Sequence, residues 1–266
     1  MQKITKNIIR DLKLLKQKNP LVLNITNYVV MNTTANALFA LGASPIMAHA
    51  TPELKEMLAI SHSLVINIGT LDATWFRSMK QAVQLAKKMK KPVILDPVGA
   101  GATELRTKKS LELLRSGGIT IVRGNFGEIS ALTGSTGLTK GTQAIGFTPE
   151  KSGKLAKLCA NKFKTITAVT GPIDFVSDGK SIYELRNGVS LLEKVTGTGC
   201  TASALIGAMA AVTNPLLAAI SGISILNLAA EQAYRESQTP GSFSIKLLDW
   251  LYKMDEQLIS TKLNII

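Results

Sequence analysis

The stretch PVILDPVGAGATELRTKKSLELLRSGGITIVR, residues 92–123, contains the pattern that decides the fold. It begins with an apolar run, Pro92–Asp96, which is typical of a buried strand. Residues 104–115 are predicted to form a helix, and a second β-branched run follows at Ile119–Arg123. A strand, a helix and a strand in this order indicate a βα unit of a mainly parallel sheet.

The same alternation extends along most of the chain, with further strands predicted at 21–26, 45–48, 63–68 and 165–170, and helices at 29–41, 73–90 and 149–162. Asp174–Asp178 and Ser181–Leu185 flank Gly179-Lys180 and predict an antiparallel hairpin that turns on Asp-Gly. The last third is helical. We therefore expect an α/β fold with a mainly parallel central sheet flanked by helices. No Pro/Ser-rich linker interrupts the chain, so one domain, 1–266, is predicted.

The composition limits the class of protein. The chain has 266 residues, 45% of them hydrophobic, which is enough for a large core. Its formal charge of +13 raises the possibility of a nucleic-acid partner. However, the lysines are spread over helix faces, as in Lys87, Lys88, Lys90 and Lys91, without interleaved aromatic residues for base stacking. No nucleic-acid partner is predicted, and a non-catalytic basic module that binds RNA or another anion stays an alternative.

One long stretch, Val195–Ala230, has no charged residue. Asn214-Pro215 divides it, and its two apolar parts, 202–212 and 216–230, are each shorter than the roughly 20 residues of a membrane span. Buried helices and no membrane partner are predicted. The N-terminus has the pattern of a basic amphipathic helix and not of a signal peptide. Neither cysteine belongs to a CxxC pair, so a structural zinc site is not expected and a reducing, cytoplasmic location is.

Polar residues and glycines stand where the predicted strands end. In an open parallel sheet, ligands bind beyond the carboxyl ends of the strands. The candidates that this rule selects are Asn24, Asn27, Met47, Gly69, Asp96, Arg123 and Thr170.

The glycine-rich segment Val195-Thr-Gly-Thr-Gly-Cys200 directly precedes an apolar helical run that begins at Ala202. Glycines allow the backbone to approach a ligand, and the free N–H groups of a helix N-terminus hold negative charge. Cys200 would stand in the first turn, where the helix dipole lowers the pKa of a thiol. The alternative is that these glycines only make a tight connection.

Asp96, Asn125 and Glu128 form a second candidate group, since oxygen ligands are what magnesium prefers. For Glu128 the simpler interpretation is an acid that stabilises a helix N-terminus. Arg123 could clamp a phosphate through its planar fork of donors, or could make a surface salt bridge. The only histidines, His49 and His62, are too isolated for a metal site.

Several of these segments, taken together, resemble the hydroxyethylthiazole kinase family of the ribokinase-like superfamily. The matching segments follow the family's order from about residue 20 to 250: Asn24-Ile-Thr-Asn27-Tyr-Val-Val, Leu95-Asp-Pro-Val-Gly99, Arg123-Gly-Asn125-Phe-Gly-Glu128, Val169-Thr-Gly171, Val176-Ser-Asp-Gly179, Val195-Thr-Gly-Thr-Gly-Cys200 and Pro240-Gly-Ser-Phe243. Cysteine in the glycine-rich turn distinguishes this family from sugar kinases, which have aspartate there. One segment differs: Gly141–Thr148 replaces the family's usual Gly-Val-Asp-Ser stretch.

The resemblance implies a ribokinase-like fold and transfer of the ATP γ-phosphoryl group to 4-methyl-5-(2-hydroxyethyl)thiazole. It implies that Asn27, Met47, Gly69 and Gly197 face the thiazole, and that Arg123, Thr170 and Gly199 bind ATP. Asp96 and Glu128 would organise Mg²⁺, Cys200 would lie near the substrate hydroxyl as a base or as a packing residue, and the chain would form a homotrimer. The nearest alternative is a related vitamin-precursor kinase that acts on hydroxymethylpyrimidine or pyridoxal, because some pyrimidine kinases also have cysteine at this position.

Overall fold

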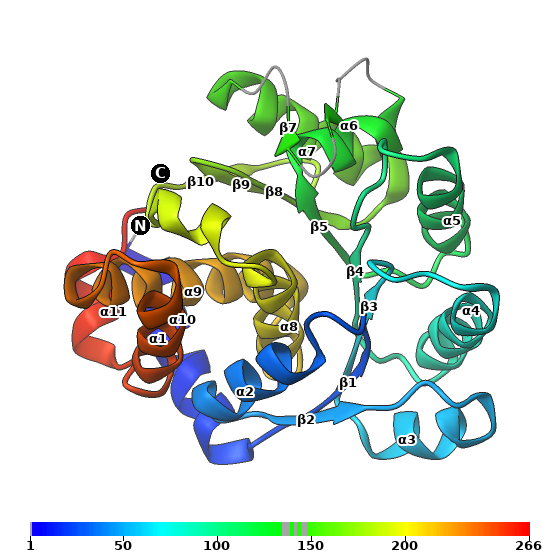
Figure 1. Ribbon diagram of the computed structural model, residues 1–266, viewed down its shortest axis with the longest axis horizontal. Helices are drawn as coiled ribbons and strands as arrows, with labels where there is room; N and C mark the ends of the chain where they lie inside the picture. The colour runs from blue at the N-terminus through cyan, green and yellow to red at the C-terminus, as the bar shows by residue number, and fades with distance from the viewer. Residues whose placement is uncertain (1, 135–138, 141–142, 145–147) are drawn as a thin grey trace.

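The computed structural model describes residues 2–134, 139–140, 143–144 and 148–266, and an eight-stranded sheet runs through the middle of the molecule (Figure 1). The strand order is β10-β9-β8-β5-β4-β3-β1-β2. The strands are β1 (Leu21–Ile25), β2 (Ser44–Met47), β3 (Ser63–Asn67), β4 (Val93–Asp96), β5 (Ile121–Asn125), β8 (Ile166–Thr170), β9 (Asp174–Ser177) and β10 (Ile182–Leu185). All neighbours from β2 to β8 pair in parallel, whereas β9 is antiparallel to both β8 and β10. A separate short pair joins β6 (Thr139–Lys140) to β7 (Gln143–Ala144).

Helices cover both faces of this sheet (Figure 1). One face carries α3 (Leu54–Ile60), α4 (Ala73–Lys88), α5 (Glu104–Arg115), α6 (Phe126–Thr133) and α7 (Pro149–Phe163), with the short 3₁₀ helix η1 (Thr51–Glu53) before α3. The other face carries α1 (Gln2–Lys18), α2 (Met31–Leu41), α8 (Thr198–Ala210), α9 (Pro215–Glu236), α10 (Pro240–Tyr252) and α11 (Glu256–Lys262), and the 3₁₀ helix η2 (Ser190–Lys194) precedes α8.

The alternation of side chains along each strand produces two separate apolar cores. In β1, for example, Val22 belongs to the core on the α8 side, and Leu23 belongs to the core on the α3 side. Helix α8 lies directly on the sheet because Gly207 has no side chain, and a Cβ there would come within 2.5 Å of Val65. Helix α9 in turn crosses α8 at Gly222, where a Cβ would lie 2.6 Å from the backbone nitrogen of Ile206.

The predicted α/β architecture, the hairpin and the helical last third are confirmed. The other predicted strands begin and end within one residue of the prediction, but β5 starts and ends two residues later, at Ile121–Asn125. Consequently Asn125 is both the last residue of β5 and the N-cap of α6, a helix that the sequence analysis did not delimit. The divergent segment Gly141–Thr148 lies largely outside the described residues.

The charge-free stretch forms two helices divided at Asn214-Pro215, as predicted. Among the described residues, only α9 is long and apolar enough to cross a membrane, because its 22 residues extend beyond the apolar part counted in the sequence. However, 83% of its most apolar window is buried within the protein, which is typical of a core helix. This burial explains its composition.

Candidate active site

The amide of Asn67, at the end of β3, contacts three of the predicted site residues. Its Nδ2 donates to Asp96 Oδ2 at 3.0 Å, and its Oδ1 accepts from Asn27 Nδ2 at 2.8 Å and from the Gly69 N–H at 2.9 Å. Neighbouring parallel strands place Asn67 opposite Asp96 in the sheet register. Asn27, Gly69 and Asp96 are among the predicted site residues, whereas Asn67 is not, because the run 63–68 predicts an interior strand position for it.

Asp96 is completely buried at the end of β4. Besides Asn67, its Oδ2 accepts a hydrogen bond of 2.8 Å from Ser203 Oγ on α8, and Arg123 Nη1 lies 3.7 Å away. Its Oδ1 is buried and has no partner among the described residues. Burial raises the pKa of Asp96, against the opposing effects of Arg123, Ser203 and Asn67. One carboxylate oxygen is thus fully used by the protein and the other is available.

Arg123 connects this carboxylate to the nucleotide residues that the resemblance implied. Its Nη2 donates to Thr170 Oγ1 at 2.5 Å, and its side chain is only 12% exposed. The guanidinium also lies against the first turn of α8, where a Cβ at Gly199 would be 2.7 Å from Nη1. Arg123, Thr170 and Gly199 are therefore neighbours, and Arg123 is not in a surface salt bridge.

The glycine-rich turn has the predicted form. Gly197 is the N-cap of α8 with a φ of 88°, a left-handed conformation that favours glycine, and a Cβ there would lie 2.8 Å from Val30. Cys200 in the first turn has its Sγ 3.6 Å from Asn27 Nδ2. The first turn of α8 is thereby tied to the segment after β1.

The expectation of a lowered thiol pKa at Cys200 is wrong. Burial and then the charge of Asp96 raise the pKa of Cys200 to about 12, although Asn67, Arg123 and Asn27 act in the opposite direction. The effect of the helix N-terminus is outweighed because a thiolate here would be desolvated and would face a carboxylate. Cys200 is therefore a neutral thiol at pH 7.

Glu128 stabilises the N-terminus of α6, as its simpler interpretation predicts, and it also contacts the turn after β4. It forms a capping box with Asn125: its Oε2 accepts from the Asn125 N–H at 2.8 Å, and Asn125 Oδ1 accepts from the Glu128 N–H at 2.9 Å. Its Oε1 accepts a 2.8 Å hydrogen bond from the Gly99 N–H in the turn after β4. Burial, followed by the charge of Asp96, raises the pKa of Glu128 to about 7. The ionisation of Asp96 therefore affects the protonation of Glu128.

Two other predicted residues, Met47 and Asn24, lie in the edge strand β2 and in its neighbour β1. Met47 ends β2, is partly buried and pairs in register with Asn24 of β1. Asn24 itself donates to the Val22 carbonyl at 2.9 Å, whereas Asn27 contacts Asn67 and Cys200. Of the two asparagines, Asn27 is the one that lies in the polar network.

Arg106 and Ser203 were also missed. Arg106 Nη1 donates to the Val98 carbonyl at 2.8 Å and Nη2 to the Gly69 carbonyl at 2.6 Å, which holds the turns after β3 and β4 together. For Ser203, its position three residues after Cys200 on the same helix was a usable signal, since such spacing keeps side chains on one face.

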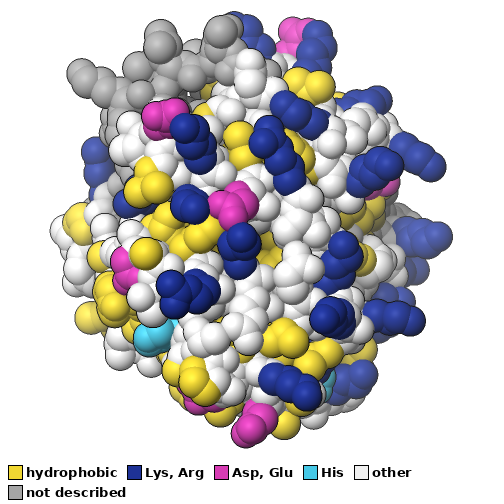
Figure 2. Space-filling view, turned by 90° about the vertical axis from the view of Figure 1, so that its right-hand side faces the viewer, with side chains coloured by type: hydrophobic (Ala, Val, Ile, Leu, Met, Phe, Trp, Pro, Cys, Tyr) yellow, Lys and Arg dark blue, Asp and Glu magenta, His cyan; other side chains and the backbone are white. Residues whose placement is uncertain are grey.

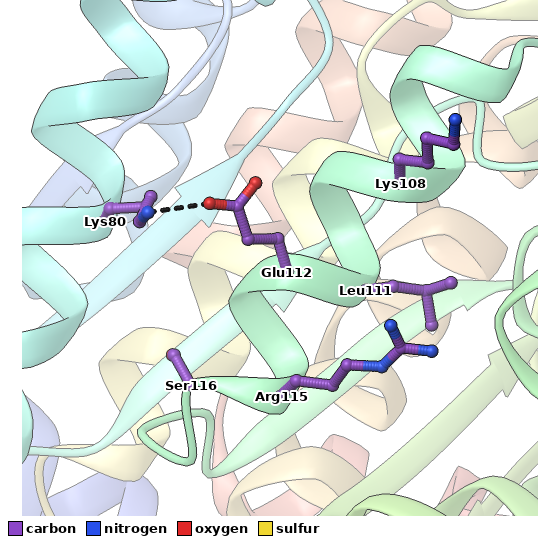
Figure 3. Close-up of a pocket in the computed structure, with 6 residues that line it drawn as sticks. All are labelled: Lys80, Lys108, Leu111, Glu112, Arg115 and Ser116. Atoms are coloured by element: carbon purple, nitrogen blue, oxygen red, sulfur yellow. Dashed lines mark ion pairs between the residues drawn. The ribbon is translucent and has the colours of Figure 1, made fainter.

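A hollow of about 500 Å³ between α4 and α5 is separate from this network (Figure 3). Its side chains are Lys80, Lys108, Leu111, Glu112, Arg115 and Ser116, none of which was predicted as a site residue. The carboxylate of Glu112 pairs with Lys80 at 2.7 Å. On the face shown in Figure 2, lysines and arginines are scattered among hydrophobic and uncharged groups and do not form one continuous stripe. This face (Figure 2) therefore does not offer a continuous basic surface for RNA.

Comparison with known proteins adds a match to the model of the hydroxyethylthiazole kinase family over residues 12–257. The chain belongs to the hydroxyethylthiazole kinase family. Relatives with that name include proteins of Pyrococcus abyssi, 55% identical over 95% of both chains, and of Methanococcus maripaludis strain C7, 52% identical over 96% of both.

Solved structures agree with this family assignment. The hydroxyethylthiazole kinase protein from Pyrococcus horikoshii OT3 superposes with a TM-score of 0.91 at 50% identity, covering 98% of each chain. Pyridoxal kinase from Staphylococcus aureus, solved with ADP, has a TM-score of 0.61 at 19% identity, covering 79% of this chain and 87% of its own. The second likeness shows the shared ribokinase-like fold alone.

Proposed function

We propose that this protein transfers the γ-phosphoryl group of ATP to the hydroxyl of 4-methyl-5-(2-hydroxyethyl)thiazole. The observation that carries the proposal is the meeting of Asp96, Arg123 and the first turn of α8 at the carboxyl edge of the sheet, in a chain of this family. Positive charge and helix N–H groups stabilise an anionic phosphoryl group in transfer, and a carboxylate oxygen can hold the metal ion that neutralises its charge.

The two substrates would approach this edge from different strands. ATP would lie over β5 and β8, where Arg123 and Thr170 contact each other and Gly199 leaves space for the guanidinium. The thiazole would lie over β1, β2 and β3, next to Asn27, Met47, Gly69 and Gly197. Asn67 and Cys200 both contact Asn27 or Asp96, so the proposed transfer point lies next to these two residues.

The carboxylates suit Mg²⁺, the metal that nucleotide kinases generally use. Asp96 Oδ1 is a buried oxygen without a partner among the described residues, and Glu128 is the second buried acid nearby. The described residues contain no group of three or more His, Cys, Asp or Glu side chains, which fits a metal that keeps water and phosphate as most of its ligands. When bound, Mg²⁺ would screen the charge of the phosphate oxygens.

The thiazole hydroxyl oxygen would attack the γ-phosphorus while the bond from phosphorus to the bridging oxygen of ADP breaks. A loose transition state of this kind needs little help from a base. With a neutral thiol at position 200, the hydroxyl proton would pass late to the phosphoryl oxygens, and Cys200 would shape the site beside the hydroxyl. Arg123 would balance the charge that develops on the transferred group.

The proposal is tested by ATP turnover with and without the thiazole alcohol, with hydroxymethylpyrimidine and pyridoxal as competing acceptors. Turnover that needs the thiazole alcohol supports the proposal. Preferred turnover of either other acceptor would assign the chain to that activity, and no ATP turnover would favour the non-catalytic alternative. The predicted homotrimer is tested by sedimentation at assay concentration, where a fully active monomer would contradict it. A cytoplasmic location stays a prediction.

A further inference from the structure

Three aromatic side chains form a cluster close in sequence to the proposed thiazole residues, and each follows a different strand, β1, β2 or β3. Trp75 is the central member: its ring centroid lies 4.3 Å from that of Tyr28, edge to face at 75°, and 4.3 Å from that of His49, stacked at 28°. Such pairs contribute more than their buried area alone. We call Tyr28, His49 and Trp75 the aromatic clamp.

Each member is close in sequence to a residue proposed to face the thiazole. Tyr28 directly follows Asn27, His49 lies two residues after Met47, and Trp75 opens α4 a few residues after Gly69. The backbone reinforces the link, since the Tyr28 N–H donates to Thr70 Oγ1 at 3.1 Å. Trp75 is itself anchored, because it is 2% exposed and its backbone N–H donates to Oδ1 of Asp72, the N-cap of α4, at 2.8 Å.

Packing alone does not account for the position of Tyr28. Its side chain is 62% exposed, so little of its area is removed from water. Its ring contacts the indole of Trp75, which in turn stacks on His49. A fixed loop after β1 would keep the Asn27 amide on Asn67 and Cys200, where the hydrogen bonds are 2.8 and 3.6 Å.

We propose that Trp75 is a positioning residue for the thiazole side of the site, acting through Tyr28 and His49 to hold the loops after β1, β2 and β3 in register. This inference rests on the proposed function for its substrate, but the clamp itself does not depend on it. The Trp75 Nε1–H is buried without an acceptor among the described residues, so phenylalanine at this position would keep the ring contacts and lose no hydrogen bond to that part of the chain.

The test uses the exposed members, because alanine at the buried Trp75 can unfold the protein. Tyr28→Ala and His49→Ala are expected to raise the KM for the thiazole alcohol by about 10-fold or more, since small displacements of positioned groups are costly. The KM for ATP should stay within about twofold, because Arg123 and Thr170 lie on other strands. Trp75→Phe, which keeps an aromatic ring at the centre of the clamp, should raise the KM for the thiazole alcohol less than Tyr28→Ala does. Tyr252→Ala is the matched control: Tyr252 is 73% exposed and lies at the end of α10.

Two further readouts separate this inference from the proposed function. Hydrogen exchange of the amides of residues 26–31, measured without substrate, should speed up in Tyr28→Ala and not in Tyr252→Ala. In a Trp250→Phe background, which leaves Trp75 as the only tryptophan, the thiazole alcohol should change the emission and ATP should not. The inference would be overturned if amide exchange in Tyr28→Ala were the same as in wild type, or if the KM values for ATP and for the thiazole alcohol rose equally. If the wild-type protein were inactive on the thiazole alcohol but exchange were still faster in Tyr28→Ala, only the proposed substrate would be overturned.

Discussion

At position 200 two opposing effects act on one thiol. Its place in the first turn of α8 favours a thiolate, while burial and the carboxylate of Asp96 disfavour it, and the result is a pKa of about 12. The sequence reveals the first effect, because a glycine-rich turn before an apolar helix is visible in it. It does not reveal the second, because Asp96 reaches this thiol only through the packing of α8 on β4.

Cys200→Ala is therefore expected to keep kcat within about tenfold of wild type, since a thiol with a pKa near 12 supplies a thiolate in only about one molecule in 10⁵ at pH 7. Steady-state rates at saturating ATP and thiazole alcohol provide the measurement. Cys200→Ser is the matched control, because it keeps a small polar group at the same position. A loss of about 10²–10⁴-fold in Cys200→Ala, with activity restored by Cys200→Asp, would instead identify position 200 as a general base.

Arg123→Ala should raise the KM for ATP by about 10- to 100-fold and that for the thiazole alcohol far less, as expected for a charge-assisted hydrogen bond worth about 1.5–3 kcal/mol. The reason is that its guanidinium contacts Thr170 and Gly199 and lies on the opposite side of Asp96 from Asn67. Arg115→Ala removes an exposed arginine from the hollow between α4 and α5 and should change neither value. Equal rises in both KM values would show that Arg123 acts structurally.

At the scale of elements, the boundaries that the sequence could not set are the ones that matter for the site. The run Ile119–Arg123 looks like a complete strand, yet pairing with β8 carries β5 on to Asn125. Because of this shift, Asn125 is the N-cap of α6, and Glu128 accepts a hydrogen bond from the Gly99 N–H. Likewise Asn67 looks like an interior strand residue until β3 and β4 are aligned side by side. Local pattern predicts where strands lie, but only the register between strands shows which polar groups meet.

The first turn of α8 gives a prediction at this scale. Gly199→Ala would place a Cβ 2.7 Å from Arg123 Nη1, so the guanidinium must move away from Asp96 and Thr170. The KM for ATP should rise by about tenfold or more, while the free energy of unfolding falls little, because a long side chain can move aside.

Gly241→Ala is the control for Gly199→Ala, since it lies in the first turn of α10 and a Cβ there meets nothing within 4 Å. It should leave both KM values unchanged and stabilise the helix slightly, because alanine has the higher helix propensity. If Gly199→Ala also had no effect on the KM for ATP, the contact between Arg123 and this turn would have no role in nucleotide binding.

At the scale of the whole molecule, the chain carries a net charge of +13, but the acids Asp96, Glu128 and Asp174 are buried. The sequence predicts the basic surface and selects Asp96 and Glu128 as candidate ligands, but it does not predict how deeply these two acids and Asp174 are buried, because burial depends on how the helices pack on the sheet. Asp174 begins β9 and accepts hydrogen bonds from the Gly171 N–H and from Asn227 Nδ2 at 2.9 and 2.7 Å. Burial raises the pKa of Asp174 to about 6. All three carboxyls are therefore easier to protonate in the folded protein than in the unfolded chain.

This property sets the sign of the pH dependence of stability. A group whose pKa is raised on folding stabilises the folded state while it is protonated, and that stabilisation is lost as the pH rises through the folded-state pKa. Since the pKa values are about 6 for Asp174 and about 7 for Glu128, the free energy of unfolding of the metal-free protein should fall between pH 5 and pH 8. The expected loss is about 1–3 kcal/mol for each of the two groups, at 1.36 kcal/mol per pKa unit.

Urea denaturation at several pH values, with a chelator and about 0.3 M salt to screen the basic surface, would measure this loss. Glu128→Gln should flatten the slope of stability against pH, whatever its absolute stability, because it removes one titrating group. Glu104→Gln is the control, since Glu104 is exposed on α5, and it should leave the slope unchanged. Magnesium with ADP should also flatten the slope by favouring the ionised carboxylates at neutral pH, because a ligand that binds only the folded state adds to its stability. A stability that rises from pH 5 to pH 8 without metal would mean that these acids are ionised at little cost, and that the buried cluster does not exist in solution as described.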